Sequence, residues 1–165
     1  MSSQKIVVFL GSKSDRAFAQ RIEEFVARTR FPVACEYRVN SAHRNLAKLL
    51  SDLKAYEESR ENIVYVTVAG LSDSLSGVVA GYTAYPVIAC PPDVEKHGLP
   101  KVFSSLMTPK GVPVALVPDP ENAALAAIKI FALSDISLRN NLQRYLATMR
   151  ETVNAADTDI VRAKS

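Results

Sequence analysis

The sequence predicts a three-layer α/β/α sandwich, in which helices cover both faces of a central parallel sheet of about five strands. Three observations indicate this fold class. Short apolar, β-branched runs alternate along the chain with longer segments of helical periodicity. The connections between them are short, and no repeat, linker or low-complexity tract interrupts them. Strands that alternate with helices in this way form parallel sheets covered on both faces.

The length of the chain favours a single domain. A chain of 165 residues can bury one sizeable core, whereas two halves would each be marginal. We therefore expect one domain over residues 1–165, with an α/β core over 1–133 and a C-terminal helix over 134–165.

The first elements follow from clear periodicities. Residues 6–10 form a continuously apolar run, typical of a strand buried on both faces. From residue 16 the apolar side chains fall on one helical stripe, and Ser14 or Asp15 can cap this helix. Alternation with period two predicts a strand over 33–39. A second amphipathic helix begins with Leu46 and ends in the polar stretch 57–62.

The second half of the chain continues the alternation, with prolines and glycines marking the breaks. The expected elements are a strand at 63–69, a buried helix at 75–82, a strand at 86–90, a short helix near 101–107, a strand at 114–117 and an alanine-rich helix at 121–133.

The C-terminal segment differs from the rest. Its apolar residues spread around a long helix that has no further strand to cover. Because that apolar surface must be buried somewhere, we expect it to contact a neighbouring subunit in a homo-oligomer. The alternative is that it folds back on its own domain.

Charge and cysteine usage narrow the class of protein. The net charge of +3 comes from scattered basic residues, so nucleic-acid binding is not favoured and small anionic substrates remain compatible. Cys35 and Cys90 are too few for a disulfide framework, which indicates free thiols in a reducing compartment. We see neither a signal-peptide pattern nor a run long enough to cross a bilayer. We therefore expect a cytoplasmic protein without membrane contacts.

Polar loops follow several of the predicted strands. In open parallel sheets ligands bind beyond the carboxyl ends of the strands, and four such loops meet this description. They are 11–15, 40–44, 70–74 and the segment after Cys90. Their convergence predicts a binding site at this edge.

The first loop suits an anion. Gly11-Ser12-Lys13-Ser14-Asp15 places free amides and a hydroxyl at a helix N-terminus. The spacing of a P-loop is absent, so nucleoside triphosphate hydrolysis is unsupported. A phosphate would repel Asp15, whose better role is to accept hydrogen bonds from sugar hydroxyls. A capped turn without any ligand is an equally good interpretation of this segment alone.

The second loop, Ser41-Ala42-His43-Arg44, carries one of only two histidines. His43 can carry a proton in either direction near neutral pH, and Arg44 can hold a phosphate with two parallel hydrogen bonds. A purely structural role at a helix start is the alternative for His43. His97 lies in a polar loop and is expected to be a solvent-exposed bystander. No metal-binding cluster is visible, and Asp73 can be either a ligand or a loop cap.

These motifs together resemble the aminoimidazole ribonucleotide carboxylase family of purine biosynthesis. The match consists of Gly-Ser-Lys-Ser-Asp, Ser-Ala-His-Arg, the segment from Ala69 to Gly77, the segment from Thr83 to Pro92, and Pro120-Glu121-Asn122-Ala123-Ala124. It covers nearly the whole chain. The resemblance implies a flavodoxin-like fold and a homo-octamer, with no metal, biotin or other cofactor.

The resemblance also implies a role for each site residue. Ser12 and Arg44 would bind the 5′-phosphate, Asp15 the ribose hydroxyls, and His43 would act as the general base. Ser41 and the loop of Gly70, Ser72, Asp73 and Ser74 would contact the rest of the substrate, the loop amides orienting its carboxylate. The substrate would be aminoimidazole ribonucleotide with carbon dioxide.

The family has two branches, a direct carboxylase and a mutase that moves a carboxylate from the exocyclic nitrogen to a ring carbon. The mutase usually carries a second histidine where this chain has Ser74, which favours the carboxylase, a carbon–carbon lyase. Arg44 is the residue usual in the mutase, an isomerase. Leu71 and Asp73 stand where the carboxylase branch typically has Arg and Asn. The mutase therefore stays open as an alternative, as does a non-catalytic protein that binds phosphoribosyl ligands.

Overall fold

The five strands form one parallel sheet in the order β2-β1-β3-β4-β5. The computed structural model describes residues 4–162. The strands are β1 (Gln4–Leu10), β2 (Ala34–Val39), β3 (Asn62–Val68), β4 (Val87–Ala89) and β5 (Ala115–Leu116). This order is the flavodoxin-like one, so the predicted fold class is confirmed.

The register of the sheet brings the carboxyl ends of the three long strands together. Leu10, at the end of β1, is paired with Val39 of β2 and with Val68 of β3. The side chains of residues 6–10 are at most 1% exposed, as expected for a strand with neighbours on both sides and helices on both faces. The loops that follow β1, β2 and β3 therefore all begin at the same edge of the sheet.

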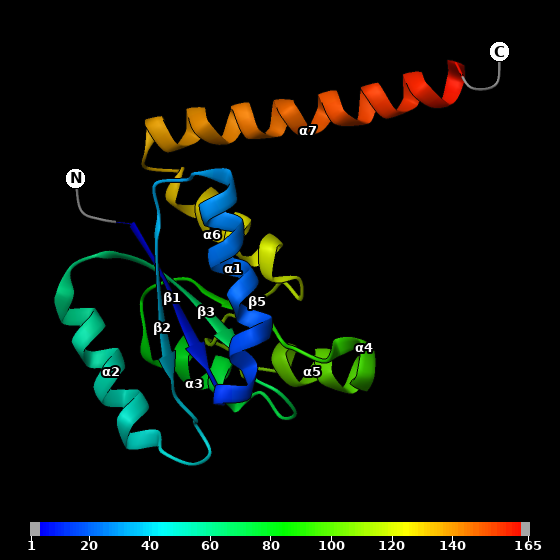
Figure 1. Ribbon diagram of the computed structural model, residues 1–165. Coiled ribbons are helices and arrows are strands. Elements are labelled where there is room, and N and C mark those ends of the chain that lie inside the picture. Colours follow the sequence, from blue (N-terminus) through cyan, green and yellow to red (C-terminus); the bar gives the residue numbers. More distant parts are fainter. Residues whose placement is uncertain (1–3, 163–165) are drawn as a thin grey trace.

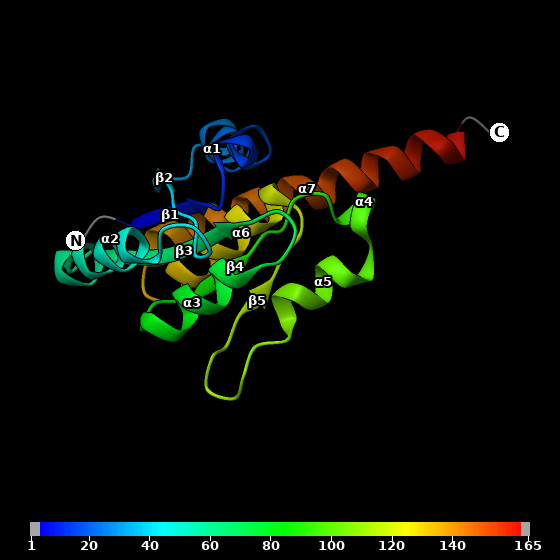
Figure 2. The same ribbon diagram turned by 90° about the horizontal axis from the view of Figure 1, so that it is seen from below.

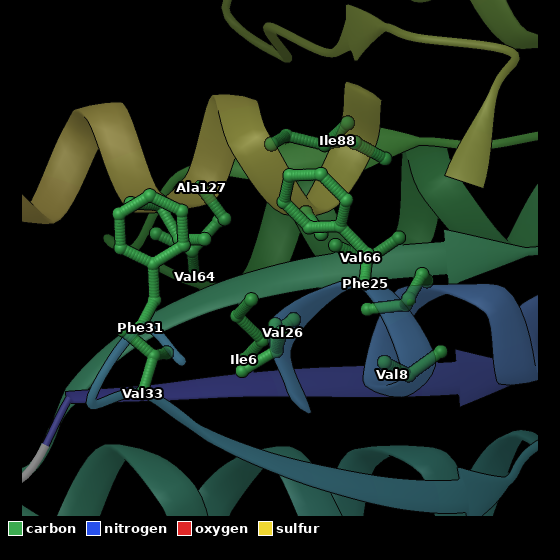
Figure 3. Close-up of a cluster of buried hydrophobic side chains, with 14 of the residues drawn as sticks. Ile6, Val8, Phe25, Val26, Phe31, Val33, Val64, Val66, Ile88 and Ala127 are labelled. Atoms are coloured by element: carbon green, nitrogen blue, oxygen red, sulfur yellow. The ribbon is translucent and has the colours of Figure 1, made fainter. Parts of the chain in front are cut away.

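Two hydrophobic clusters lie on opposite faces of the sheet. Helices α1 (Arg16–Thr29) and α6 (Pro120–Phe131) pack on the face that carries Ile6 and Val8. Helices α2 (Leu46–Ser59) and α3 (Ser74–Tyr82) pack on the face that carries Val7 and Phe9. Figure 2 shows α1 and α3 on either side of the strands, and Figure 3 shows the first cluster around Ile6, Val8 and Val66.

The segment after β4 contains one helix more than the sequence predicts. Helix α4 (Val94–His97) precedes α5 (Leu99–Leu106), and Gly98 with φ of +62° separates them. Four residues are too few to show a helical period, which explains why the sequence indicated only the second helix, near 101–107. Pro100 is the second residue of α5, in the first turn, where a missing amide is tolerated.

The C-terminal helix α7 (Ile136–Arg162) has two different halves. Leu138 and Leu142 are buried against the domain's own core, and Tyr145 packs edge-on against Phe25 and Phe31. The second half extends beyond the sheet (Figure 1). Its exposed apolar side chains are Met149, Val153, Ile160 and Val161. The start of α7 thus folds back on its own domain, the alternative to the expected subunit contact, whereas the apolar side chains of its later part are exposed.

No helix within residues 4–162 combines the length and the apolar character needed to cross a bilayer.

Candidate active site

A cavity of about 540 Å³ opens at the carboxyl ends of β1, β2 and β3. Three of the four loops predicted from the sequence line it directly, and the fourth, after Cys90, contributes Asp93. The lining residues are Gly11, Ser12, Ser14, Asp15, Ser41, Ala42, His43, Arg44, Ala69, Gly70, Leu71, Ser72, Leu75 and Asp93.

The first loop is held by a reciprocal pair of hydrogen bonds at the start of a short 3₁₀ turn, Lys13–Asp15. The Ser12 side chain accepts from the Ser14 amide, and Asp15 Oδ2 accepts from the Ser12 amide at 2.8 Å. The side chain that caps this turn is therefore that of Ser12, rather than that of Ser14 or Asp15. Asp15 stands at the N-cap position of α1, but its carboxylate makes no capping bond to that helix.

Asp15 sits in an unfavourable electrostatic environment for a carboxylate. Burial raises its pKa, the hydrogen bond from Ser12 opposes that rise, and Asp93 adds to it. Lys101 and Arg44 are the nearby cations that lower it. One oxygen is bonded to the Ser12 amide, and the other lies 3.8 Å from where a Cβ atom on Gly70 would be.

Arg44 bridges the first two loops. Its Nη2 atom donates to the Gly11 carbonyl at 2.9 Å, and its Nε atom donates to Ser41 Oγ at 3.2 Å. The next residue, Asn45, caps α2 by accepting from the Lys48 amide at 3.1 Å. Arg44 is exposed and presents a fork of donors at the mouth of the cavity.

His43 lies opposite the start of α3. Its Nε2 atom is 2.6 Å from Ser74 Oγ, so the imidazole and the hydroxyl share one hydrogen bond. Both ring nitrogens of a neutral imidazole cannot donate at once, and the partner of Nε2 therefore influences which nitrogen is free to accept a proton. His43 thus has a partner that can hold the orientation of its ring.

The third loop turns Asp73 away from the cavity. Asp73 is 6% exposed and caps α3, since Oδ1 accepts from the Ser76 amide at 3.0 Å. Its Oδ2 atom accepts from Ser76 Oγ and from Ser105 Oγ, each at 2.6 Å. Of the two roles that the sequence allowed, the structure gives Asp73 the loop cap. The expectation that it contacts substrate has no support in this geometry.

Leu71 is an exposed residue of the third loop. Its side chain is 72% exposed, and its φ of +53° is unusual for a residue other than glycine. Gly70, Leu71 and Ser72 all line the cavity. Ser74 is not in the lining and reaches the site through His43.

Asp93 and Lys101 are two charged residues near the site that sequence reasoning did not single out. Asp93 lines the cavity with φ of +60°. Lys101 lies on α5 and is only 2% exposed. The spacing of Lys101, Ser104 and Ser105 in a short helix whose other residues are apolar was the available signal for a buried polar face. His97, expected to be exposed, is half-buried and lies outside the main cavity.

Comparison with known sequences gives one consistent result. Residues 5–152 match the family described as AIR carboxylase. The phosphoribosylaminoimidazole carboxylase of Archaeoglobus fulgidus is 41% identical over 156 residues, which cover 94% of this chain and 84% of that protein. The N5-carboxyaminoimidazole ribonucleotide mutase of Methanocaldococcus jannaschii is 37% identical over 157 residues, which cover 94% and 96% of the two chains.

Comparison with solved structures agrees. The crystal structure of Treponema denticola PurE is similar with a TM-score of 0.89 and 33% sequence identity, covering 94% of this chain and 98% of that one. The similarity therefore extends over the whole arrangement of strands and helices that builds the cavity.

Proposed function

The chain belongs to the AIR carboxylase family of purine biosynthesis, and we propose that it attaches carbon dioxide directly to the ring carbon of 5-aminoimidazole ribonucleotide. The product is 4-carboxy-5-aminoimidazole ribonucleotide. The observation that carries the proposal is the pairing of His43 with Ser74, beside a cavity that also holds Ser12, Asp15 and Arg44.

The phosphorylated end of the substrate lies between the first two loops. Ser12 and Arg44 bind the 5′-phosphate, because Arg44 already spans these loops and its guanidinium has donors to spare. Asp15 accepts hydrogen bonds from the ribose hydroxyls. Burial raises the pKa of Asp15, so hydrogen bonds from the ribose hydroxyls would stabilise its ionised form.

The chemical step forms one carbon–carbon bond and breaks one carbon–hydrogen bond. The electron-rich ring carbon attacks carbon dioxide, and His43 removes the proton from that same carbon, which restores the aromatic ring. Ser41 and the backbone amides of Gly70 and Ser72 orient the new carboxylate. The reaction uses no ATP, biotin or metal, so positioning in the cavity and one general base account for the catalysis.

The residue that favours a carboxylase over a mutase is Ser74. A hydroxyl bonded to His43 replaces the second histidine that the mutase usually has, and no second imidazole lines the cavity among residues 4–162. The relatives carry both names, one a carboxylase and one a mutase. The decisive test supplies the purified protein with either aminoimidazole ribonucleotide and bicarbonate or the N5-carboxyamino isomer, in both cases without ATP.

The expected result is turnover of aminoimidazole ribonucleotide with bicarbonate. Turnover of the N5-carboxyamino isomer alone would instead identify a mutase. The matched variant His43→Asn is expected to bind the nucleotide and to lose about 10²–10⁴-fold in kcat, the range for general acid–base catalysis. Binding by both proteins with chemistry in neither would identify a non-catalytic ligand-binding protein.

We also propose a homo-octamer in the cytoplasm. The exposed apolar side chains of the second half of α7 supply a surface that a neighbouring subunit can cover. Cys35 and Cys90 are free, and burial raises the pKa of each thiol to about 12, which suits inert thiols in a reducing compartment.

A further inference from the structure

Side chains of helix α5 form hydrogen bonds with the third loop of the site. Lys101 on α5 is 2% exposed, and its Nζ atom donates to the Ala69 carbonyl at 2.5 Å and to the Leu71 carbonyl at 2.8 Å. A buried lysine is stable only where its charge and its donors find partners; here two loop carbonyls accept from the ammonium, and the carboxylates of Asp73, Asp15 and Asp93 favour its charged form. The ammonium group is thus an anchor beneath the loop.

Two serines on the same face of α5 extend this anchor. The Asp73 amide donates to Ser104 Oγ at 2.7 Å, and Ser105 Oγ donates to Asp73 Oδ2 at 2.6 Å. Positions 101, 104 and 105 are spaced three and four residues apart, so their side chains lie on one side of the helix. The loop is therefore fixed to α5 at both of its ends.

The bonds to Lys101 determine where the loop amides point. The N–H of a trans peptide is directed opposite to its own C=O, and the structure contains no cis peptide in the described residues. Because the Ala69 and Leu71 carbonyls point at Lys101, the amides of Gly70 and Ser72 point away from it. Gly70 and Ser72 both line the main cavity.

The charge of Lys101 is also placed to favour an anion above the loop. Burial lowers the pKa of Lys101, while the carboxylates of Asp73, Asp15 and Asp93 act in the opposite direction. Asp73 is occupied by hydrogen bonds from Ser76 and Ser105. The peptide groups whose carbonyls accept from Lys101 carry the amides of Gly70 and Ser72. These amide hydrogens become more positive, because linked hydrogen bonds polarise and strengthen one another.

We propose that Lys101 is a positioning residue that presents the amides of Gly70 and Ser72 to the carboxylate of the substrate or product. It acts through the loop and does not touch the nucleotide. This role rests on the proposed function, because it assigns the carboxylate of that reaction to these amides. It predicts that Lys101 affects ligands with a ring carboxylate far more than ligands without one, because its hydrogen bonds reach only the third loop.

The test compares two ligands on the full-length protein by calorimetry, aminoimidazole ribonucleotide and its 4-carboxy product. Lys101→Met is expected to lose about tenfold in affinity for the carboxylated nucleotide, as for a lost hydrogen bond to a charged group. Its affinity for aminoimidazole ribonucleotide is expected to stay within about threefold. The KM for bicarbonate rises with the same variant, and the KM for aminoimidazole ribonucleotide does not.

Two further variants keep the test decisive. Lys96→Met makes the same chemical change at an exposed position on α4 and is expected to match the wild type. Ser104→Ala removes only the bond to the Asp73 amide, and it should show a smaller loss of the same kind even if Lys101→Met does not fold.

The outcomes are distinguishable from failure of the proposed function. A wild-type protein that turns over its substrate while Lys101→Met behaves like Lys96→Met overturns the role of Lys101 alone. Equal loss of affinity for both nucleotides in Lys101→Met also overturns it, because that pattern reports general damage to the fold. A wild-type protein that shows no turnover and binds both nucleotides equally overturns the proposed function together with this inference.

Discussion

The Nε2 atom of His43 and the Oγ atom of Ser74 are 2.6 Å apart, although 31 residues separate them in the chain. The contact joins the loop after β2 to the first residue of α3. It is the one direct hydrogen bond in the described residues between the proposed general base and another side chain. The orientation of the imidazole therefore depends on Ser74.

Ser74→Ala tests this dependence. A lost neutral hydrogen bond is worth about 0.5–1.5 kcal/mol, so we expect kcat to fall about 2- to 13-fold. The KM for aminoimidazole ribonucleotide should not change, because Ser74 lies outside the phosphate and ribose contacts. Steady-state kinetics with Ser51→Ala, an exposed serine on α2, as the control would measure this. A variant with wild-type kcat would remove Ser74 from the site.

Arg44→Ala tests the phosphate contact. Hydrogen bonds to charged groups are worth about 1.5–3 kcal/mol, so the Kd for the nucleotide should rise by about 10- to 150-fold. Arg44→Lys should be intermediate, since a single ammonium cannot bridge the Gly11 carbonyl and Ser41 as the fork does. Isothermal calorimetry with Arg60→Ala, at the far end of α2, as the control gives the comparison. Unchanged affinity in Arg44→Ala would assign the phosphate elsewhere.

Asp15→Asn separates stability from binding. Burial raises the pKa of Asp15, so the folded state binds a proton more readily than the unfolded state does. The stability of the wild type therefore decreases as pH rises from the pKa of Asp15 in the unfolded chain to its higher pKa in the folded protein. The ionised carboxylate at pH 7 is thus destabilising. We expect Asp15→Asn to be at least as stable as the wild type at pH 7 and to bind the nucleotide more weakly.

The pH dependence provides the check on this assignment. The stability difference between the two proteins should shrink as pH falls from the raised pKa of folded Asp15 to its pKa in the unfolded chain, and below the latter it should stay constant, because the wild-type carboxyl is then protonated in both states. Urea unfolding at several pH values measures it. A difference that grows towards low pH would contradict the raised pKa.

Leu138→Ala tests how α7 is attached. Leu138 is fully buried in the first hydrophobic cluster, the one that contains Ile6 and Val8. Its truncation should therefore lower the free energy of unfolding by about 2–5 kcal/mol. Lys129→Ala, on the exposed side of α6, should change it by no more than about 0.5 kcal/mol. Similar small changes for both variants would mean that α7 does not pack on the domain.

Ending the chain after Arg150 tests the rest of α7. This cut keeps Leu138, Leu142 and Tyr145, which belong to the core or pack against it, and removes Val153, Ile160 and Val161. We expect a smaller assembly in light scattering with an unchanged circular dichroism spectrum per residue. An assembly with the same number of subunits would show that the end of α7 makes no subunit contact.

The sequence predicted the fold well because its strongest signals are local. The apolar run 6–10 and the helical stripe from residue 16 each reflect one period, and both elements appear where expected. Helix α4 was missed because four residues carry no period. The two halves of α7 were not separated, because Leu138 and Val153 are both apolar and only the folded domain reaches the first of them.

The site was predictable where it depends on strand ends. Ser12, His43 and Arg44 follow strands whose carboxyl ends must meet in a parallel sheet, and they line one cavity. Contacts made across the fold could not be read in the same way. Nothing local joins Ser74 to His43, or Lys101 to the carbonyl of Leu71, across 31 and 30 positions of the chain.

The position of β1 between β2 and β3 determines which amides ligand binding should protect from hydrogen exchange. β1 is paired with both β2 and β3, and the three loops of the cavity leave from these strands. A nucleotide that spans the loops can be held only while all three strands are in place, so it should slow amide hydrogen exchange across the sheet by mass action. Amides near the exposed end of α7 should exchange at the same rate with and without it.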